Sequence, residues 1–457
     1  MKKLLPTVAI GVLAFTLAGC AGTTAPTSTQ SDAPGPEALK NADGVTEISL
    51  WHGFGGVGGE AVDSFVAKFN TEHEGEIKVT SSYQGTYADL LAKYTAGLRD
   101  DSIPTVLLAG DVASGYLSDV QRSISPEAMA KANPDALDLD ELRAASANYY
   151  TVGGELAAVP IATSKPVLWV NKDMLAEAGI PADVDLSTLD DVADVARQIT
   201  AATGKPGLVE PFDGWWFEQL TAGSGNVYCT PENGRGSDGR ATAVNLSDPD
   251  QVDAIQTVAD LYTDGVGLDV GIDGNAAVTA FTGSQVAMMF QSSGALGGIK
   301  TGATFDYEAL AYPISGDEEE AGSVVGGSAM WLSSLGTDAE TVAGWELESY
   351  LASAEVQEEW SHITGYIAVN STVDNSTTQQ AYLKENPIQQ VFLDQLENTP
   401  AVPATAGCLS GAMTAIRSAV VTQMQSAFTG AISVEDGLKA AETEANKAID
   451  QYIEQVG

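Results

Sequence analysis

Hydrophobic and polar residues recur with two different periods along the chain, and these periods predict strands and helices in alternation. Residues 45–51 (VTEISLW) alternate between polar and apolar and predict a strand. Val62, Phe65, Val66 and Phe69 then recur at the spacing of one helix face. Further strands are predicted over 76–82 and 105–109, with a helix over 87–99 between them. This order predicts an α/β architecture.

A second series of elements begins after residue 150. Strands are predicted over 156–161, 167–170, 286–290, 305–312 and 326–335, and helices over 173–178, 192–201, 251–262, 276–283, 342–354 and 356–363. Residues 411–456 are mostly helical, with acidic outer faces. The roughly 410 residues involved exceed what one core usually serves, so we expect two lobes. We place lobe 1 at 45–158 plus 313–349, and lobe 2 at 159–312 plus 350–457.

The first residues have the pattern of an export signal. Lys2 and Lys3 precede an apolar stretch from residue 4 to 17, which is shorter than the roughly 20 residues of a membrane-spanning helix. The tetrad from Leu17 to Cys20 resembles the lipobox of bacterial lipoproteins, which implies a signal over 1–19 and a lipid on Cys20. Residues 20–44, rich in Thr, Ser, Pro and Gly, then predict a flexible linker. We expect a location on the outer face of the cell membrane, with membrane contact through the lipid alone.

Charge and cysteine content narrow the possible functions further. The formal net charge of −41 disfavours binding to nucleic acid or to anionic lipid headgroups. Beyond Cys20 the chain has two cysteines, Cys229 and Cys408. An even pair in an oxidising compartment predicts a disulfide, and two separate buried thiols are the alternative.

Motifs for catalysis or cofactor binding are weak. Gly53, Gly55 and Gly58 match a dinucleotide-binding pattern, but the acidic residue expected near the end of the next strand is missing. The three histidines lack metal-ligand spacing. We therefore expect no cofactor, no metal site and no enzyme activity, although a carboxylate pair of the glycosidase type stays open in so acidic a chain.

Aromatic residues beside hydroxyls and glycines stand out in the predicted loops. Such groups occur over 212–216 (FDGWW), 291–294 (QSSG) and 364–366 (TGY). Aromatic faces cover the apolar face of a sugar or polyol, while hydroxyls, amides and carboxylates bind its polar rim. The pattern favours a sugar or polyol ligand.

At the level of whole segments, the chain resembles family 1 extracellular solute-binding proteins of ABC importers, and most closely their glycerol-3-phosphate-binding branch. The matching stretches are 51–53 (WHG), 60–64 (EAVDS), 83–87 (YQGTY), 160–179, 292–294, 326–327, 330–331 and, most specifically, 353–369 (SAEVQEEWSHITGYIAV). The resemblance implies a monomer with a type II, maltose-binding-protein-like fold. Its two α/β lobes would close on a small molecule at a hinge and deliver it to the permease subunits.

The resemblance also implies a set of ligand-binding residues. Its members are Tyr87, Asp111, Ser164, Phe212, Trp215, Ser292, Ser293, Gly326, Gly327 and Tyr366. The family's phosphate-binding Arg would fall near Cys408, where no Arg stands, and Arg417 matches a different family position. Because Arg supplies the bidentate phosphate contact, a mono- or oligosaccharide is favoured over glycerol 3-phosphate or a glycerophosphodiester. A secreted glycan hydrolase is the alternative from another class.

Overall fold

The structure is a computed structural model that describes residues 33–236, 239–316 and 319–456. Residues from 33 onward form one compact unit. The predicted signal over 1–19 and the lipid-bearing Cys20 lie outside the described residues. In the part of the chain that is described, no helix combines the length and the apolar character that a membrane span requires.

The first sheet has the strand order β2-β1-β3-β13-β6. Its strands are β1 (Thr46–His52), β2 (Ile77–Tyr83), β3 (Val106–Gly110), β6 (Val159–Ser164) and β13 (Gly326–Leu332). The first three strands are parallel, and β13 runs antiparallel between β3 and β6. The carboxyl ends of β1, β3 and β6 therefore meet the amino end of β13 at one edge of the sheet.

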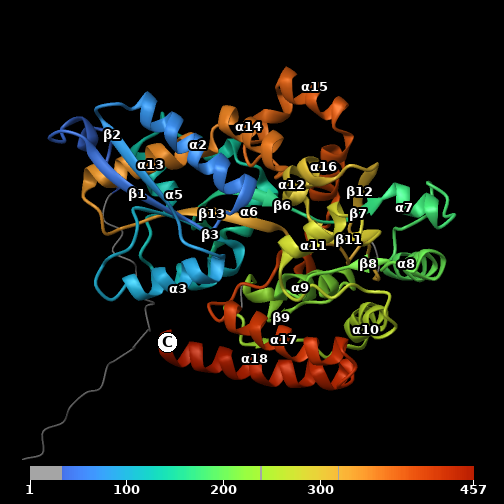
Figure 1. The fold of residues 1–457 in the computed structure, drawn as a ribbon. Helices are drawn as coiled ribbons and strands as arrows, with labels where there is room; N and C mark the ends of the chain where they lie inside the picture. The colour runs from blue at the N-terminus through green and yellow to red at the C-terminus, as the bar shows by residue number, and fades with distance from the viewer. Residues whose placement is uncertain (1–32, 237–238, 317–318, 457) are drawn as a thin grey trace, which may run out of the picture. The chain divides into compact units, whose positions relative to one another are not determined.

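Helices cover this first sheet, and together they form lobe 1 (Figure 1). They are α2 (Gly56–Glu72), α3 (Tyr87–Gly97), α4 (Ser114–Val120), α5 (Pro126–Ala132), α6 (Ala144–Tyr149), α13 (Asp338–Ala352) and α14 (Ala354–Thr364). Local sequence fixes several of their starts. Thr86 and Asp89 form a capping box that starts α3, and Thr337 and Glu340 form a second one that starts α13.

The second sheet has the order β12-β7-β11-β8 and forms the centre of lobe 2. Its strands are β7 (Pro166–Asn171), β8 (Leu208–Val209), β11 (Met288–Ser292) and β12 (Tyr307–Ala311). Side chains of β7 alternate between two cores, because successive residues of a strand point to opposite faces. Leu168 and Val170 join the larger core of lobe 2, while Val167 and Trp169 join a smaller core on the other face.

Helices of lobe 2 pack on both faces of its sheet. They are α7 (Lys172–Glu177), α8 (Leu189–Thr203), α9 (Gly214–Gly223), α10 (Pro249–Thr263), α11 (Gly274–Thr282), α12 (Leu296–Gly302), α15 (Thr377–Glu385), α16 (Pro387–Asn398), α17 (Met413–Phe428) and α18 (Val434–Val456). The last two, drawn in red, lie side by side along lobe 2, where α17 contacts α9 and α18 contacts α10 (Figure 1). Short strand pairs, β4 (Thr151–Val152) with β5 (Glu155–Leu156) and β9 (Cys229–Thr230) with β10 (Ala243–Val244), complete the regular structure.

The division between the lobes differs from the predicted one at two places. Strand β6 pairs with β13 in the first sheet, so lobe 1 extends to Ser164 and not only to residue 158. Helix α14 also packs in lobe 1, where Trp360 is part of the core. The chain crosses between the lobes at Ser164–Pro166, again over 312–325 and a third time between α14 and α15. We call the first two the crossover segments.

The end of the predicted linker is ordered. Residues Glu37–Lys40 form the short helix α1, which packs against α13. Asn133 donates a hydrogen bond to the carbonyl oxygen of Pro34, 3.0 Å away. Packing against lobe 1 thus begins before residue 45, because even this polar segment places Ala33 and Leu39 against the core.

Candidate functional site

Most of the predicted ligand-binding residues gather at the edge of the first sheet where β1, β3, β6 and β13 meet. Asp111 follows β3, Ser164 ends β6 and Gly326 begins β13, directly opposite Ser164. Lobe 2 contributes Trp215 from the first turn of α9. We call the set Tyr87, Asp111, Ser164, Trp215, Ser292, Gly326 and Tyr366 the sheet-edge site.

Tyr87 forms one wall of the sheet-edge site. Its ring lies over two glycines, since a Cβ atom on Gly53 or Gly110 would come within 2.6 or 2.7 Å of the ring carbons. Phe54 meets the Tyr87 ring edge-on, with 6.0 Å between centroids. Burial raises the pKa of the Tyr87 hydroxyl well above its usual range, so it stays a neutral hydrogen-bonding group. Gly53, the first glycine of the apparent dinucleotide motif, therefore makes room for this tyrosine.

Tyr366 joins lobe 1 to the loop after β11. Its ring stacks on Trp360 at a centroid distance of 5.6 Å. On its other side it contacts Gly294, where a Cβ atom would lie 2.7 Å from the phenol carbon. Burial raises the pKa of Tyr366 to about 12. Ser292, two residues before Gly294, uses its hydroxyl to accept a hydrogen bond from the Gly294 amide.

The adjacent tryptophans of α9 have different surroundings. Trp216 is 1% exposed and packs in the lobe 2 core against Phe290 and Tyr312. Trp215 is only partly buried, and it lies so close to Gly326 that a Cβ there would be 2.7 Å from its ring. The Trp215 indole nitrogen is buried and has no hydrogen-bond partner within the described residues.

Three of the predicted ligand-binding residues have evident structural roles. Phe212 is 4% exposed and packs edge-on against Tyr262 and Phe428 in the lobe 2 core. Ser293 is fully buried, and its hydroxyl accepts a hydrogen bond from the Lys165 amide. Gly327 has a φ of +139°, and a Cβ there would clash with the Ala162 carbonyl. These three residues therefore support the structure around the sheet-edge site, and we do not count them among its members.

A buried ion-pair cluster lies beside the sheet-edge site and was not predicted from the sequence. Arg417 of α17 contacts Asp111 of lobe 1 at 2.8 Å and Glu218 of α9 at 2.6 Å. All three side chains are at most 15% exposed. The partners are 306 and 199 residues apart along the chain, so no local pattern connects them.

Burial also changes the charge state of the neighbouring carboxyl groups. It raises the pKa of Glu218 to about 7, that of Asp213 to about 6 and that of Glu210 to about 8. Arg417 opposes the shift for the first two groups. The region beside the sheet-edge site is consequently less negative near pH 7 than its composition suggests.

The predicted disulfide is confirmed. Cys229 and Cys408 are bonded, with their Cα atoms 5.7 Å apart. The bond closes a loop of 179 residues in sequence separation. Asn233 reinforces the same region, because its side chain accepts from the Cys229 amide and donates to the Pro403 carbonyl. In the described ranges, no three His, Cys, Asp or Glu side chains come together as a metal site.

These features define a two-lobed α/β binding protein with aromatic and polar groups gathered where the lobes meet. The family model for "Bacterial extracellular solute-binding protein" matches residues 64–387, and the chain belongs to this family. The fold is the maltose-binding-protein-like fold that was predicted.

Individual relatives agree with this assignment. The chain is 29% identical over 420 residues to the sn-glycerol-3-phosphate-binding periplasmic protein UgpB of Pectobacterium atrosepticum, covering 90% of this chain and 93% of the relative. UgpB of Mycobacterium tuberculosis, solved with glycerophosphocholine, has a TM-score of 0.75 at 18% identity, with 89% and 99% of the two chains covered. The cyclic α-maltosyl-1,6-maltose binding protein of Arthrobacter globiformis has a TM-score of 0.70 at 21% identity, with the same coverage.

Proposed function

We propose that this protein captures a carbohydrate, a mono- or oligosaccharide, at the sheet-edge site and delivers it to the permease of an ABC importer. The aromatic rings of Tyr87, Trp215 and Tyr366 offer apolar faces to a sugar ring. The Asp111 carboxylate and the Ser164 hydroxyl would supply an acceptor and a donor for its hydroxyl groups. In this role the protein binds its ligand without chemical conversion.

The main observation in favour of an uncharged ligand is that Arg417 is paired with Asp111 and Glu218. An arginine side chain gives the strongest bidentate contact to a phosphate, and Arg417 already has two carboxylate partners. Lys165 follows Ser164 directly in the chain, but it is fully buried and bonded to the Ser323 carbonyl. Neither cation reaches the sheet-edge site unpaired, which favours a ligand without a phosphate group.

A glycerol 3-phosphate or a glycerophosphodiester is the second candidate ligand. It is favoured by the similarity over about nine-tenths of the chain to a protein that is named for binding glycerol 3-phosphate. Binding of a phosphate would require Arg417 to exchange Asp111 for the ligand.

Calorimetric titration with maltose, cyclic maltosyl-maltose, glycerol 3-phosphate and glycerophosphocholine tests the proposal. We expect a saccharide to bind, and to be recovered unchanged after prolonged incubation. Binding of the two phosphate compounds alone would favour the second candidate. Release of shorter sugars would favour the glycan hydrolase.

The lipid anchor and the closure of the lobes belong to the same proposal. We propose that Cys20 carries a diacylglycerol that tethers the protein to the outer face of the membrane, which mass spectrometry of the purified protein would detect. Ligand-driven closure predicts a smaller radius of gyration in solution scattering when the ligand is added. An unchanged radius at saturating ligand would argue against closure.

A further inference from the structure

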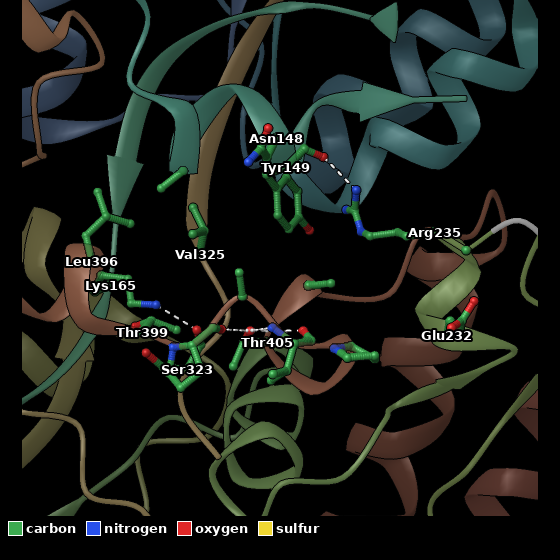
Figure 2. A pocket seen from close by; sticks show the side chains of 17 residues that line it. Asn148, Tyr149, Lys165, Glu232, Arg235, Ser323, Val325, Leu396, Thr399 and Thr405 are labelled. Carbon is green, nitrogen blue, oxygen red and sulfur yellow. Dashed lines mark hydrogen bonds between the residues drawn. The ribbon is translucent and has the colours of Figure 1, made fainter. Parts of the chain in front are cut away.

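A cavity of about 360 Å³ lies at the crossover segments, and it has a different lining from the sheet-edge site. Its lining comes from the end of α6, both crossover segments, residues 232–236 and the stretch 396–406 (Figure 2). We call it the crossover cavity. Lys165 and Val325 line it, whereas their neighbours Ser164 and Gly326 belong to the sheet-edge site. Lys165 and Val325 lie in the crossover segments just outside strands β6 and β13, and neither of them is part of the sheet-edge site.

Lys165 marks one side of the crossover cavity. Its side chain is fully buried, and its ammonium group donates one hydrogen bond, 2.6 Å long, to the Ser323 carbonyl (Figure 2). No carboxylate of the described residues pairs with it. Burial lowers the pKa of Lys165 to about 7. An unpaired ammonium group in such a place is costly to keep charged.

Arg235 marks the opposite side of the crossover cavity. It donates to the backbone carbonyls of Gly407 at 2.7 Å and Tyr149 at 2.9 Å, and it lies 4.5 Å from the centre of the Tyr149 ring. Its Nη2 is buried and finds no acceptor in the part of the chain that the structure describes. Glu232 is the one carboxylate of the lining; it is exposed and makes no ion pair with Arg235 among the described residues.

The two other buried cations of the described residues show how this chain usually treats such groups. Arg143 is paired with Asp374 and Glu397, and Arg417 with Asp111 and Glu218. A chain with 62 acidic residues has carboxylates in ample supply. The crossover cavity nonetheless has a cationic group on each of two opposite sides and no buried carboxylate among its described lining residues, which leaves a place for negative charge from outside the chain.

We propose that the crossover cavity binds a small organic anion, a carboxylate or phosphate group on a short apolar body. The anion would bind within the cavity that Lys165 and Arg235 flank from opposite sides (Figure 2). The remaining lining suits an apolar body, because Val325, Leu396 and neighbouring prolines form much of the wall. This site is separate from carbohydrate capture and does not depend on it.

The test measures the melting temperature and the calorimetric binding of the full-length protein with inorganic phosphate, acetate and butyrate, against sodium chloride of equal ionic strength. We expect at least one of these anions to bind, and a preference for butyrate or for phosphate identifies the anionic group. Lys165→Met and Arg235→Met should each weaken that binding by about tenfold or more, as for a lost hydrogen bond to a charged group. Lys447→Met, the same change at an exposed lysine, should leave it unaltered.

Two further measurements separate this site from the sheet-edge site and from loss of folding. Anion binding should persist in Trp215→Ala, and at pH 8 it should take up protons in wild type but not in folded Lys165→Met. Anion affinity that is equal in wild type and in both cavity variants would overturn the proposal. Loss of anion binding in Trp215→Ala would also overturn it. The same holds if phosphate, acetate and butyrate give the same melting temperature and the same calorimetric signal as sodium chloride.

Discussion

The two sides of the crossover segments differ in how they treat buried charge. On the sheet-edge side, Arg417 is held by two carboxylates from different lobes. On the cavity side, Lys165 and Arg235 have backbone carbonyls and, for Arg235, the Tyr149 ring as partners among the described residues, but no carboxylate. One pair of segments therefore separates a neutralised region, suited to an uncharged ligand, from a region with a surplus of positive charge.

This difference depends on where the chain leaves its strands more than on composition. Residues 164 and 165 are neighbours in the chain, but Ser164 ends β6 opposite Gly326, whereas the Lys165 side chain reaches the Ser323 carbonyl in the other crossover segment. Adjacency in the sequence alone would assign Lys165 to the same site as Ser164. The predictions below test the contrast, beginning with the largest expected effect.

Replacing Arg417 should destabilise the protein most. Arg417→Met leaves the Asp111 and Glu218 carboxylates buried without their partner, which commonly lowers the free energy of unfolding by about 3–5 kcal/mol. Urea unfolding measures the change. Arg197→Met removes a half-exposed arginine with its two surface pairs and should cost about 1 kcal/mol or less. Equal losses of unfolding free energy in the two variants would show that the buried cluster stabilises the protein no more than surface ion pairs do.

The two tryptophans of α9 should separate stability from binding. Trp216→Ala removes a ring from the lobe 2 core and should lower the unfolding free energy by about 3–5 kcal/mol. Trp215→Ala should mainly weaken carbohydrate binding, by about 2 kcal/mol or roughly 30-fold. Calorimetry and urea unfolding of both variants give the comparison. If Trp215→Ala binds as wild type does, this tryptophan is not part of the ligand site.

Loss of the disulfide should affect the cavity side. The double variant Cys229→Ser with Cys408→Ser should be less stable by about 2–5 kcal/mol. Gly407, which accepts from Arg235, precedes Cys408, so anion binding should also weaken. Carbohydrate affinity in the folded variant should change less than anion affinity. The opposite order would place the disulfide's influence on the sheet-edge side.

Replacing Lys165 should have the smallest effect on the free energy of unfolding, and it should raise that free energy where the other changes lower it. Lys165→Met removes an unpaired buried ammonium but leaves the Ser323 carbonyl without its donor, so we expect a gain of about 1 kcal/mol in unfolding free energy near neutral pH.

The titration of Lys165 should also make the free energy of unfolding depend on pH. Its folded pKa is lowered from 10.5 to about 7, so the unfolded chain binds more protons between these values. Wild-type stability therefore rises over this range, and the advantage of Lys165→Met is complete below pH 7 and shrinks toward pH 10.5. An advantage that grows with pH would contradict the assignment.

Several strands and helices could be predicted from the sequence because their patterns are local. The alternation over 45–51 becomes β1, and the apolar run 167–170 lies inside β7. No helix or strand was predicted over 113–150, where the structure has three short helices, α4, α5 and α6. These helices of six or seven residues depend on packing against lobe 1, which a local pattern does not record.

Which of the predicted residues bind a ligand stays a prediction, but the structure shows which of them lie together. Tyr87, Asp111, Ser164 and Tyr366 lie near one edge of the first sheet, whereas Phe212 lies in the lobe 2 core. In the first turn of α9, the ring of Trp215 lies against Gly326, whereas Trp216 packs in the core.

The sequence by itself determined the α/β class, the position of several strands along the chain, the family and, through cysteine number, the disulfide. It did so because these properties follow from the spacing of residues along the chain. Tertiary structure alone decided that Arg417 is neutralised while Lys165 and Arg235 are not. Coulomb interaction depends on distance and on the surrounding medium, and both are set only when residues hundreds of positions apart are buried together.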